Sequence, residues 1–151
     1  MQLKLRQRLA REESGFTLVE LLVVMLILGL LVAIAIPTFF NQKQKANDAD
    51  SKAMVHTAQT AIETYATDHN GDYTGATLAL LQGIEGTIDG SVSIQGTPSA
   101  TSYTVRATNP TTTHWFEIQR AGGTFTYVCN PGGQGGCPDD ATPGGNGDWG
   151  G

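Results

Sequence analysis

One long apolar run dominates the hydropathy pattern of the chain. Residues 21–36 (LLVVMLILGLLVAIAI) contain no polar side chain, and 20 of the 25 residues from 16 to 40 are apolar. At 1.5 Å per residue, a helix of 25 residues measures about 37 Å, which exceeds the hydrocarbon core of a bilayer at roughly 30 Å. The pattern therefore predicts a membrane-spanning helix over residues 16–40.

Basic residues precede this run. Lys4, Arg6, Arg8 and Arg11 all lie within the first 15 residues. Positive charge next to a membrane helix stays on the cytoplasmic side. We therefore expect an N-terminus in the cytoplasm, an anchor in the cytoplasmic membrane, and export of everything after Phe40.

A second helical pattern follows the apolar run directly. From Asn41 to about His69 the chain is polar, with an apolar stripe at steps of three and four residues, the period of an amphipathic helix. Asn70 and Gly71 suit a left-handed helix end. We expect helix to continue to Asp68, with its stripe covered by other elements. The stripe consists of Met54, Val55, Ala58, Ala61, Ile62 and Tyr65.

The pattern changes to a period of two after Gly90. Four short runs rich in β-branched and aromatic residues are predicted strands, and residues 121–123 suit a tight hairpin between the last two. A short helical turn is expected at residues 77–82. The predicted strands are Ser91–Gln95, Ser102–Ala107, His114–Gln119 and Thr124–Cys129.

These elements together predict an α+β fold. A long N-terminal helix, one half in the membrane and one half amphipathic, would pack against a small antiparallel β-sheet of about four strands. Alternate strand residues would then face the helix. We expect this inner face to contain Val92, Ile94, Val105, Phe116, Ile118 and Phe125.

The start of the apolar run allows three kinds of processing. The run could be an uncleaved signal anchor, or a secretory signal that is cleaved after Ala33-Ile34-Ala35. Alternatively, the chain is cleaved ahead of the run, at Ser14-Gly15-Phe16, and the membrane helix survives. Only the last alternative assigns a task to Glu20, a carboxylate that is costly inside a membrane. It would pair with the new Phe16 α-ammonium of a neighbouring copy; otherwise Glu20 is an interfacial carboxylate near a positive helix N-terminus.

The residues around this junction resemble a known family. Gly15-Phe16-Thr17-Leu18-x-Glu20, the apolar run, and Pro37 as the twenty-second residue after Gly15 are similar to the N-terminus of type IV pilins and type II secretion pseudopilins. The resemblance covers about residues 11–45. It implies that a prepilin peptidase cleaves between Gly15 and Phe16 and N-methylates Phe16, and that Glu20 is the assembly carboxylate.

The resemblance also implies a function and partners. The chain would be a structural subunit without enzymatic activity or cofactor, which leaves the membrane through an assembly platform and joins copies of itself and other pilins in a surface filament. Such a filament would serve adhesion, motility or DNA uptake. The alternatives are a pseudopilin of a type II secretion system and a minor tip pilin that binds a ligand.

Two residues within the apolar run weaken a helix. Gly29 has no side chain, and Pro37 removes one helical hydrogen bond. The stretch between them could loosen when subunits leave the bilayer. Equally, glycine is common in membrane helices and Pro37 could simply bend the chain.

Cys129 and Cys137 are the two cysteines of the chain. The predicted orientation places both outside the cytoplasm, where disulfides form, so we expect a Cys129–Cys137 bond. It would tie residues 130–151, which are rich in glycine and proline, to the last strand.

The remaining tail has a composition that cannot build a core. We expect disorder beyond Cys137. Asp139, Asp140 and Asp148 could ligate calcium, as acidic C-terminal loops do in the pseudopilins that the chain resembles, but this interpretation is not favoured. The expected organisation is a cleaved leader at 1–15, the membrane and filament-core helix at 16–40, a globular domain at 41–129, and the tethered tail at 130–151.

Charge and histidine spacing narrow the function further. The formal net charge of −5 divides into +2 for residues 1–15 and −7 for the remainder. Residues 41–151 carry 5 Lys and Arg against 11 Asp and Glu, which disfavours direct nucleic-acid binding. His56, His69 and His114 share no metal-ligand spacing and are expected on the surface, so no metal site or catalytic group is predicted.

Overall fold

The computed structural model describes residues 15–138 and Trp149. These residues belong to two compact units, one ending at Phe39 and one beginning at Phe40. Asp139, Asp140 and Asp148, which the sequence offers as possible but unfavoured calcium ligands, lie outside the described residues.

Helix α2 runs from Leu18 to Asp68. In the first unit its large apolar side chains are exposed, and it is the one helix among the described residues that is long and apolar enough to cross a membrane. The predicted end is confirmed. Asn70 and Gly71 have φ values of 58° and 84°, and the Gly71 N–H closes the last turn on the Ala66 carbonyl at 2.7 Å.

Four strands form one antiparallel sheet in the order β1-β2-β3-β4. Each lies within two residues of its predicted range. Gly122 and Gly123, with φ values of 56° and 92°, form the predicted hairpin between Ala121 and Thr124. The elements after α2 are α3 (Leu78–Ile84), β1 (Val92–Ile94), β2 (Ser102–Thr108), β3 (Trp115–Ala121) and β4 (Thr124–Asn130).

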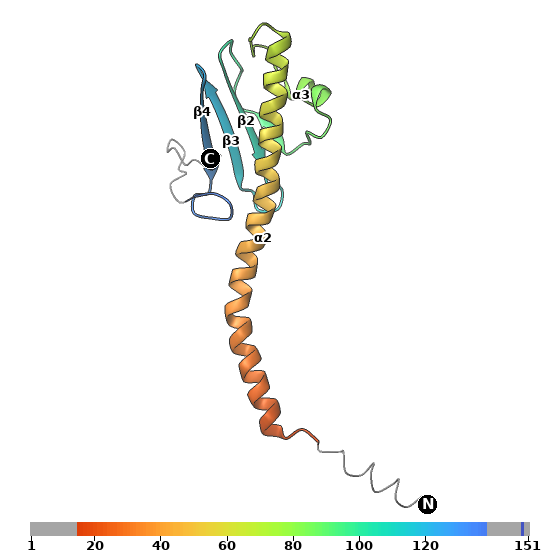
Figure 1. The fold of residues 1–151 in the computed structure, drawn as a ribbon, viewed down its shortest axis with the longest axis vertical. Helices are drawn as coiled ribbons and strands as arrows, with labels where there is room; N and C mark the ends of the chain where they lie inside the picture. Colours follow the sequence, from red (N-terminus) through yellow and green to blue (C-terminus); the bar gives the residue numbers. More distant parts are fainter. Residues whose placement is uncertain (1–14, 139–148, 150–151) are drawn as a thin grey trace, which may run out of the picture. The chain divides into compact units, whose positions relative to one another are not determined.

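The sheet lies beside the second half of α2 (Figure 1). The predicted stripe is confirmed, because four of its residues are at most 1% exposed and pack in one cluster with the inner face of the sheet. The expected α+β fold is therefore present. The fully covered residues of the stripe are Val55, Ala58, Ala61 and Ile62.

The expectation that Phe125 belongs to this core is wrong. Its side chain is 37% exposed, at the hairpin end of β4, and its ring lies 5.3 Å from the Arg120 guanidinium. Tyr103, by contrast, is 3% exposed and belongs to the core. Strand alternation predicts the face of a residue, but coverage at the end of a strand depends on what packs there.

Candidate assembly site and buried carboxylates

Thr17 and Glu20 form a reciprocal cap at the start of α2. The Glu20 backbone N–H donates to Thr17 Oγ1 at 3.2 Å, while the Thr17 N–H and hydroxyl both donate to Glu20 Oε2, at 2.9 and 2.8 Å. This is a capping box, in which two residues satisfy backbone donors that the first helical turn leaves free. It explains why the helix begins at Leu18.

The cap holds the Glu20 carboxylate next to the predicted cleavage junction. Phe16 is 89% exposed, and among the described residues no atom beyond the two chain neighbours of Gly15 lies within 4 Å of a Cβ built on Gly15. Glu20 Oε1 accepts no hydrogen bond from the residues that the structure describes. The peptide bond is therefore accessible, and one carboxylate oxygen is available to a partner from outside the chain.

Helix α2 continues through Gly29 and Pro37 without interruption. Pro37 has no N–H to donate within the helix, and the hydroxyl of the next residue, Thr38, donates to the Ala35 carbonyl at 2.9 Å. A Cβ built on Gly29 meets nothing within 4 Å. The structure contains one helical state only, so loosening of residues 29–37 during assembly stays a prediction.

Asp48 is a carboxylate with no solvent exposure in the second unit. Its Oδ1 accepts from Asn109 Nδ2 at 2.9 Å and from the Thr112 hydroxyl at 3.2 Å. Its Oδ2 accepts from the Gly136 backbone N–H at 2.9 Å and pairs with His114 Nδ1 at 2.8 Å. Asp48 thereby joins α2 to the β2–β3 connection and to the loop between the two cysteines.

The partners of Asp48 keep it ionised. Burial alone would raise its pKa, but the hydrogen bonds from Gly136, His114 and Asn109 outweigh burial, so the pKa of Asp48 lies below its ordinary value. Lys52, one helical turn away, has a pKa lowered by burial, and the charge of Asp48 opposes that lowering. The network is a satisfied buried charge cluster.

Glu63 forms a second junction between helix and sheet. It accepts hydrogen bonds from the hydroxyls of Tyr103 at 2.7 Å and Tyr73 at 2.8 Å, and from Arg120 Nη1 at 2.7 Å. Burial would raise the pKa of Glu63, but these three donors lower it overall. Burial and the Glu63 carboxylate together raise the pKa of Tyr73 to about 12.

The predicted disulfide joins Cys129 to Cys137. Both cysteines are buried and belong to the hydrophobic core. The loop between them leaves no room for a side chain at Gly135, because a Cβ there would overlap Asp48 Oδ2 and lie 3.0 Å from His114 Nδ1. Glycine at this position allows the loop to approach the buried carboxylate.

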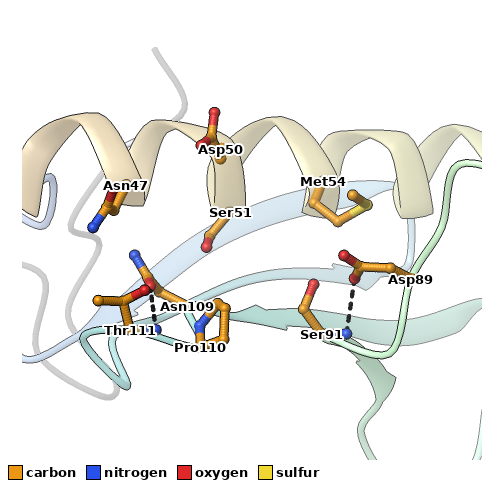
Figure 2. A pocket seen from close by; sticks show the side chains of 9 residues that line it. All are labelled: Asn47, Asp50, Ser51, Met54, Asp89, Ser91, Asn109, Pro110 and Thr111. Carbon is orange, nitrogen blue, oxygen red and sulfur yellow. Dashed lines mark hydrogen bonds between the residues drawn. The ribbon is translucent and has the colours of Figure 1, made fainter.

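A pocket of about 200 Å³ lies between α2 and the loops that flank β1 and β2. Figure 2 shows Asp50 on the helix and Asp89 on the loop before β1, where Asp89 accepts a hydrogen bond from the Ser91 N–H at 2.8 Å. Among the described residues, no three His, Cys, Asp or Glu side chains are grouped in a way that could hold a metal ion. The pocket is small and open to solvent, and most of the residues that line it are polar.

Two expectations from the sequence are wrong in this unit. His114 is not a surface residue, because it is 5% exposed and paired with Asp48, whereas His69 is exposed. Disorder beyond Cys137 does not hold for Trp149, which is 8% exposed. Residues 139–148 and 150–151 lie outside the described part of the chain.

The capping role of Thr17 and the contacts that Asp48, Glu63 and Trp149 make with distant segments were not predicted from the sequence. For Thr17 a signal was present, because Thr17-Leu18-Val19-Glu20 has the spacing of a capping box. The other three have no local signal. Asp48 and Glu63 have the appearance of ordinary polar residues on an amphipathic helix.

Comparison with known proteins extends this picture over most of the chain. Residues 10–36 match the prokaryotic N-terminal methylation motif. Over 121 residues the chain is 35% identical to the type IV wide pilus major component PilA4 of Thermus thermophilus, covering 80% of this chain and 84% of that protein. The chain belongs to the type IV pilin family.

Other relatives of this pilin match over a shorter length. It is 35% identical over 60 residues to type II secretion system core protein G of Aeromonas hydrophila, covering 40% of this chain and 42% of that protein. It is 39% identical over 59 residues to competence protein ComGC of Streptococcus pneumoniae, covering 39% and 55%. No solved structure gives a significant match.

Membership gives this pilin a general role. It is a pilin-like structural subunit, with a processing motif at its N-terminus and an apolar helix suited to membrane anchoring. Subunits of this family assemble into filaments of many copies.

Proposed function

We propose that this pilin is a subunit of a type IV surface pilus. The observation that carries the proposal is the match of 121 residues to a major pilus component, which covers 84% of that protein. The matches to secretion and competence proteins cover only about 60 residues. A pseudopilin of a type II secretion system is the second candidate, and the presence or absence of the chain in long surface fibres distinguishes the two.

Maturation would begin at the junction that the fold leaves accessible. The prepilin peptidase cleaves between Gly15 and Phe16, removes the basic leader and methylates the Phe16 amine. Before cleavage the leader holds the N-terminus in the cytoplasm. The assembly platform then transfers the subunit from the membrane to the filament, and the stretch from Gly29 to Pro37 loosens during this step.

Glu20 would have two tasks in this process. Within its own chain it caps α2 through Oε2. In the filament its carboxylate neutralises the Phe16 ammonium of a neighbouring subunit, since a charge removed from water needs a partner of opposite sign. The contact is heterologous and does not close, so repetition produces a helical fibre.

The outer part of the subunit would be structural rather than catalytic. Its excess of acidic over basic residues, 11 against 5 in residues 41–151, makes direct binding to nucleic acid unfavourable. If the pilus takes part in DNA uptake, another subunit would contact the DNA. A tip pilin that binds a ligand is a less favoured role, because the relative matched over most of its length is a major component.

A pair of substitutions separates the two tasks of Glu20. Glu20→Gln keeps a capping side chain at the third helical position but removes the charge. Thr17→Ala removes the cap but keeps the charge. We expect Glu20→Gln to reduce filament yield at least about tenfold, and Thr17→Ala to retain most of the yield, measured by shearing and immunoblotting of surface fibres.

The controls concern processing and membrane insertion. Both variants should accumulate in the membrane, and their intact mass should show loss of residues 1–15 and gain of one methyl group on Phe16. Normal filament yield from Glu20→Gln would overturn the assembly role of Glu20. A mature protein that begins at Ile36 would overturn the processing scheme as a whole.

A further inference from the structure

Trp149 lies two residues before the end of the chain and is nevertheless 8% exposed. Its indole Nε1–H donates a hydrogen bond to the Val128 carbonyl at 3.1 Å. Val128 belongs to β4, the last strand in the sheet order. The indole N–H therefore donates to a backbone carbonyl of an edge strand. The apolar surface of the indole is buried, and its single donor has a hydrogen-bond partner.

Three aromatic rings surround the indole. Its centroid lies 5.4 Å from those of His56 on α2, Phe116 on β3 and Tyr127 on β4, with interplanar angles of 64°, 76° and 86°. These are edge-to-face arrangements, which aromatic pairs prefer. We call the site the indole pocket; it consists of Lys52, His56, Phe116, Tyr127 and Val128.

A cation completes the indole pocket. Lys52 Nζ lies 5.5 Å from the centroid of the Trp149 ring and 5.3 Å from that of Phe116. A desolvated ammonium near an aromatic face is attracted by the ring quadrupole. Because Lys52 is itself partly buried, the pocket offers an indole a ring environment, a cation and a backbone acceptor together.

The indole covers part of a core residue and of the strand beside it. Phe116, on β3, is fully buried, and its ring packs edge-on against the indole. Without Trp149, the Phe116 ring would lose this contact and the Val128 carbonyl would lose its hydrogen-bond donor. An uncovered edge strand with apolar neighbours is also a template for pairing with another chain.

We propose that the indole pocket, formed by residues of α2, β3 and β4, is a binding site for an indole side chain, and that Trp149 of the same chain fills it. Trp149 is then a functional part of the globular unit, because its indole closes the core at β4 and occupies a carbonyl of that edge strand. This proposal is independent of filament function, because it concerns the folded subunit alone.

Fluorescence of the full chain in detergent tests whether the site is filled. The chain has two tryptophans, so Trp115→Phe leaves Trp149 as the only reporter. We expect blue-shifted emission and protection from acrylamide quenching, both lost in denaturant. Emission typical of an indole in water in the folded protein would overturn the proposal.

A second measurement tests the site as a receptor. In the variant Trp115→Phe/Trp149→Ala the pocket is empty and the protein has no tryptophan of its own. A synthetic peptide with the sequence of residues 139–151 should bind this variant with a blue shift of its single tryptophan, and the same peptide with alanine at its tryptophan should fail to compete. Absence of saturable binding to a variant with native circular dichroism would overturn the proposal.

Dilution of the protein shows whether the indole comes from the same chain or from a second copy. A tethered tryptophan has a high effective concentration, so protection of Trp149 should be independent of protein concentration, and Trp115→Phe should bind the peptide about tenfold or more weakly than the empty variant. Loss of protection on dilution at constant detergent would mean that a second copy supplies the indole, and would overturn the assignment to the same chain.

Discussion

At the scale of single residues, the determining feature of the globular unit is a carboxylate with no solvent exposure. Asp48 accepts four hydrogen bonds, from two side chains of the β2–β3 connection, from His114 and from the Gly136 backbone. A buried charge is tolerated only when it is fully satisfied, and removal of one partner leaves the others unsatisfied. Asp48 therefore keeps three separate segments in one arrangement.

Asp48→Asn tests this role with almost no change in volume. An amide cannot accept at both positions, so either the Gly136 N–H and His114 or the donors at Oδ1 lose their acceptor. We expect a loss of roughly 3–5 kcal/mol in the free energy of unfolding, measured by urea denaturation. Asp50→Asn, exposed on the same helix, should change it by less than about 0.5 kcal/mol.

At the scale of elements, the loop between the cysteines is held both at its ends and in its middle. The disulfide holds its ends, and Asp48 holds its middle through Gly136. Gly135 lies in the left-handed region at φ 57°, against Asp48 and His114. The loop between the cysteines has the composition of a flexible linker, but it packs closely against Asp48 and His114.

Gly135→Ala should disrupt this fit, and Gly122→Ala provides the matched control. Gly122 has nearly the same φ, 56°, but nothing within 4 Å of an added Cβ. Gly122→Ala should cost about 1–2 kcal/mol of unfolding free energy from backbone strain alone. Gly135→Ala should cost roughly 1–3 kcal/mol more, because the methyl group overlaps Asp48. Equal costs in urea denaturation would contradict the proposed packing of the loop.

At the scale of the whole molecule, membrane anchoring and the globular fold depend on different segments of α2. Up to Phe39 the helix exposes apolar side chains suited to a bilayer or a filament core. From Phe40 it belongs to the compact unit, where Asp48 and Glu63 bind it to other elements. The stability of that unit therefore depends on two ionised carboxylates.

This dependence predicts how stability responds to pH. Both Asp48 and Glu63 have a pKa below the ordinary value, so the unfolded state binds more protons in acid. Their contribution is complete above the unfolded pKa values, about 3.9 and 4.3, and is lost as pH falls through the lower folded values. The unfolding free energy in urea should decline below about pH 4, and less steeply in Glu63→Gln. An unchanged slope in that variant would contradict the role of Glu63.

The sequence alone was sufficient for features that depend on neighbouring residues. The apolar run, the helix end at Asn70 and Gly71, the hairpin at Gly122 and Gly123 and the alternation of the strands follow from local chemistry. The capping box of Thr17 and Glu20 could also have been predicted, since its partners are three residues apart.

Tertiary structure decided which polar residues are buried and what covers the end of the sheet. The partners of Asp48 are 61 to 88 residues distant in the chain, and Trp149 reaches Val128 across 21 residues. No periodicity encodes such pairs, because a side chain is buried only when distant elements meet around it. The packing of these distant elements explains why Asp48, His114 and Trp149 are buried. It also explains why Phe125 is exposed.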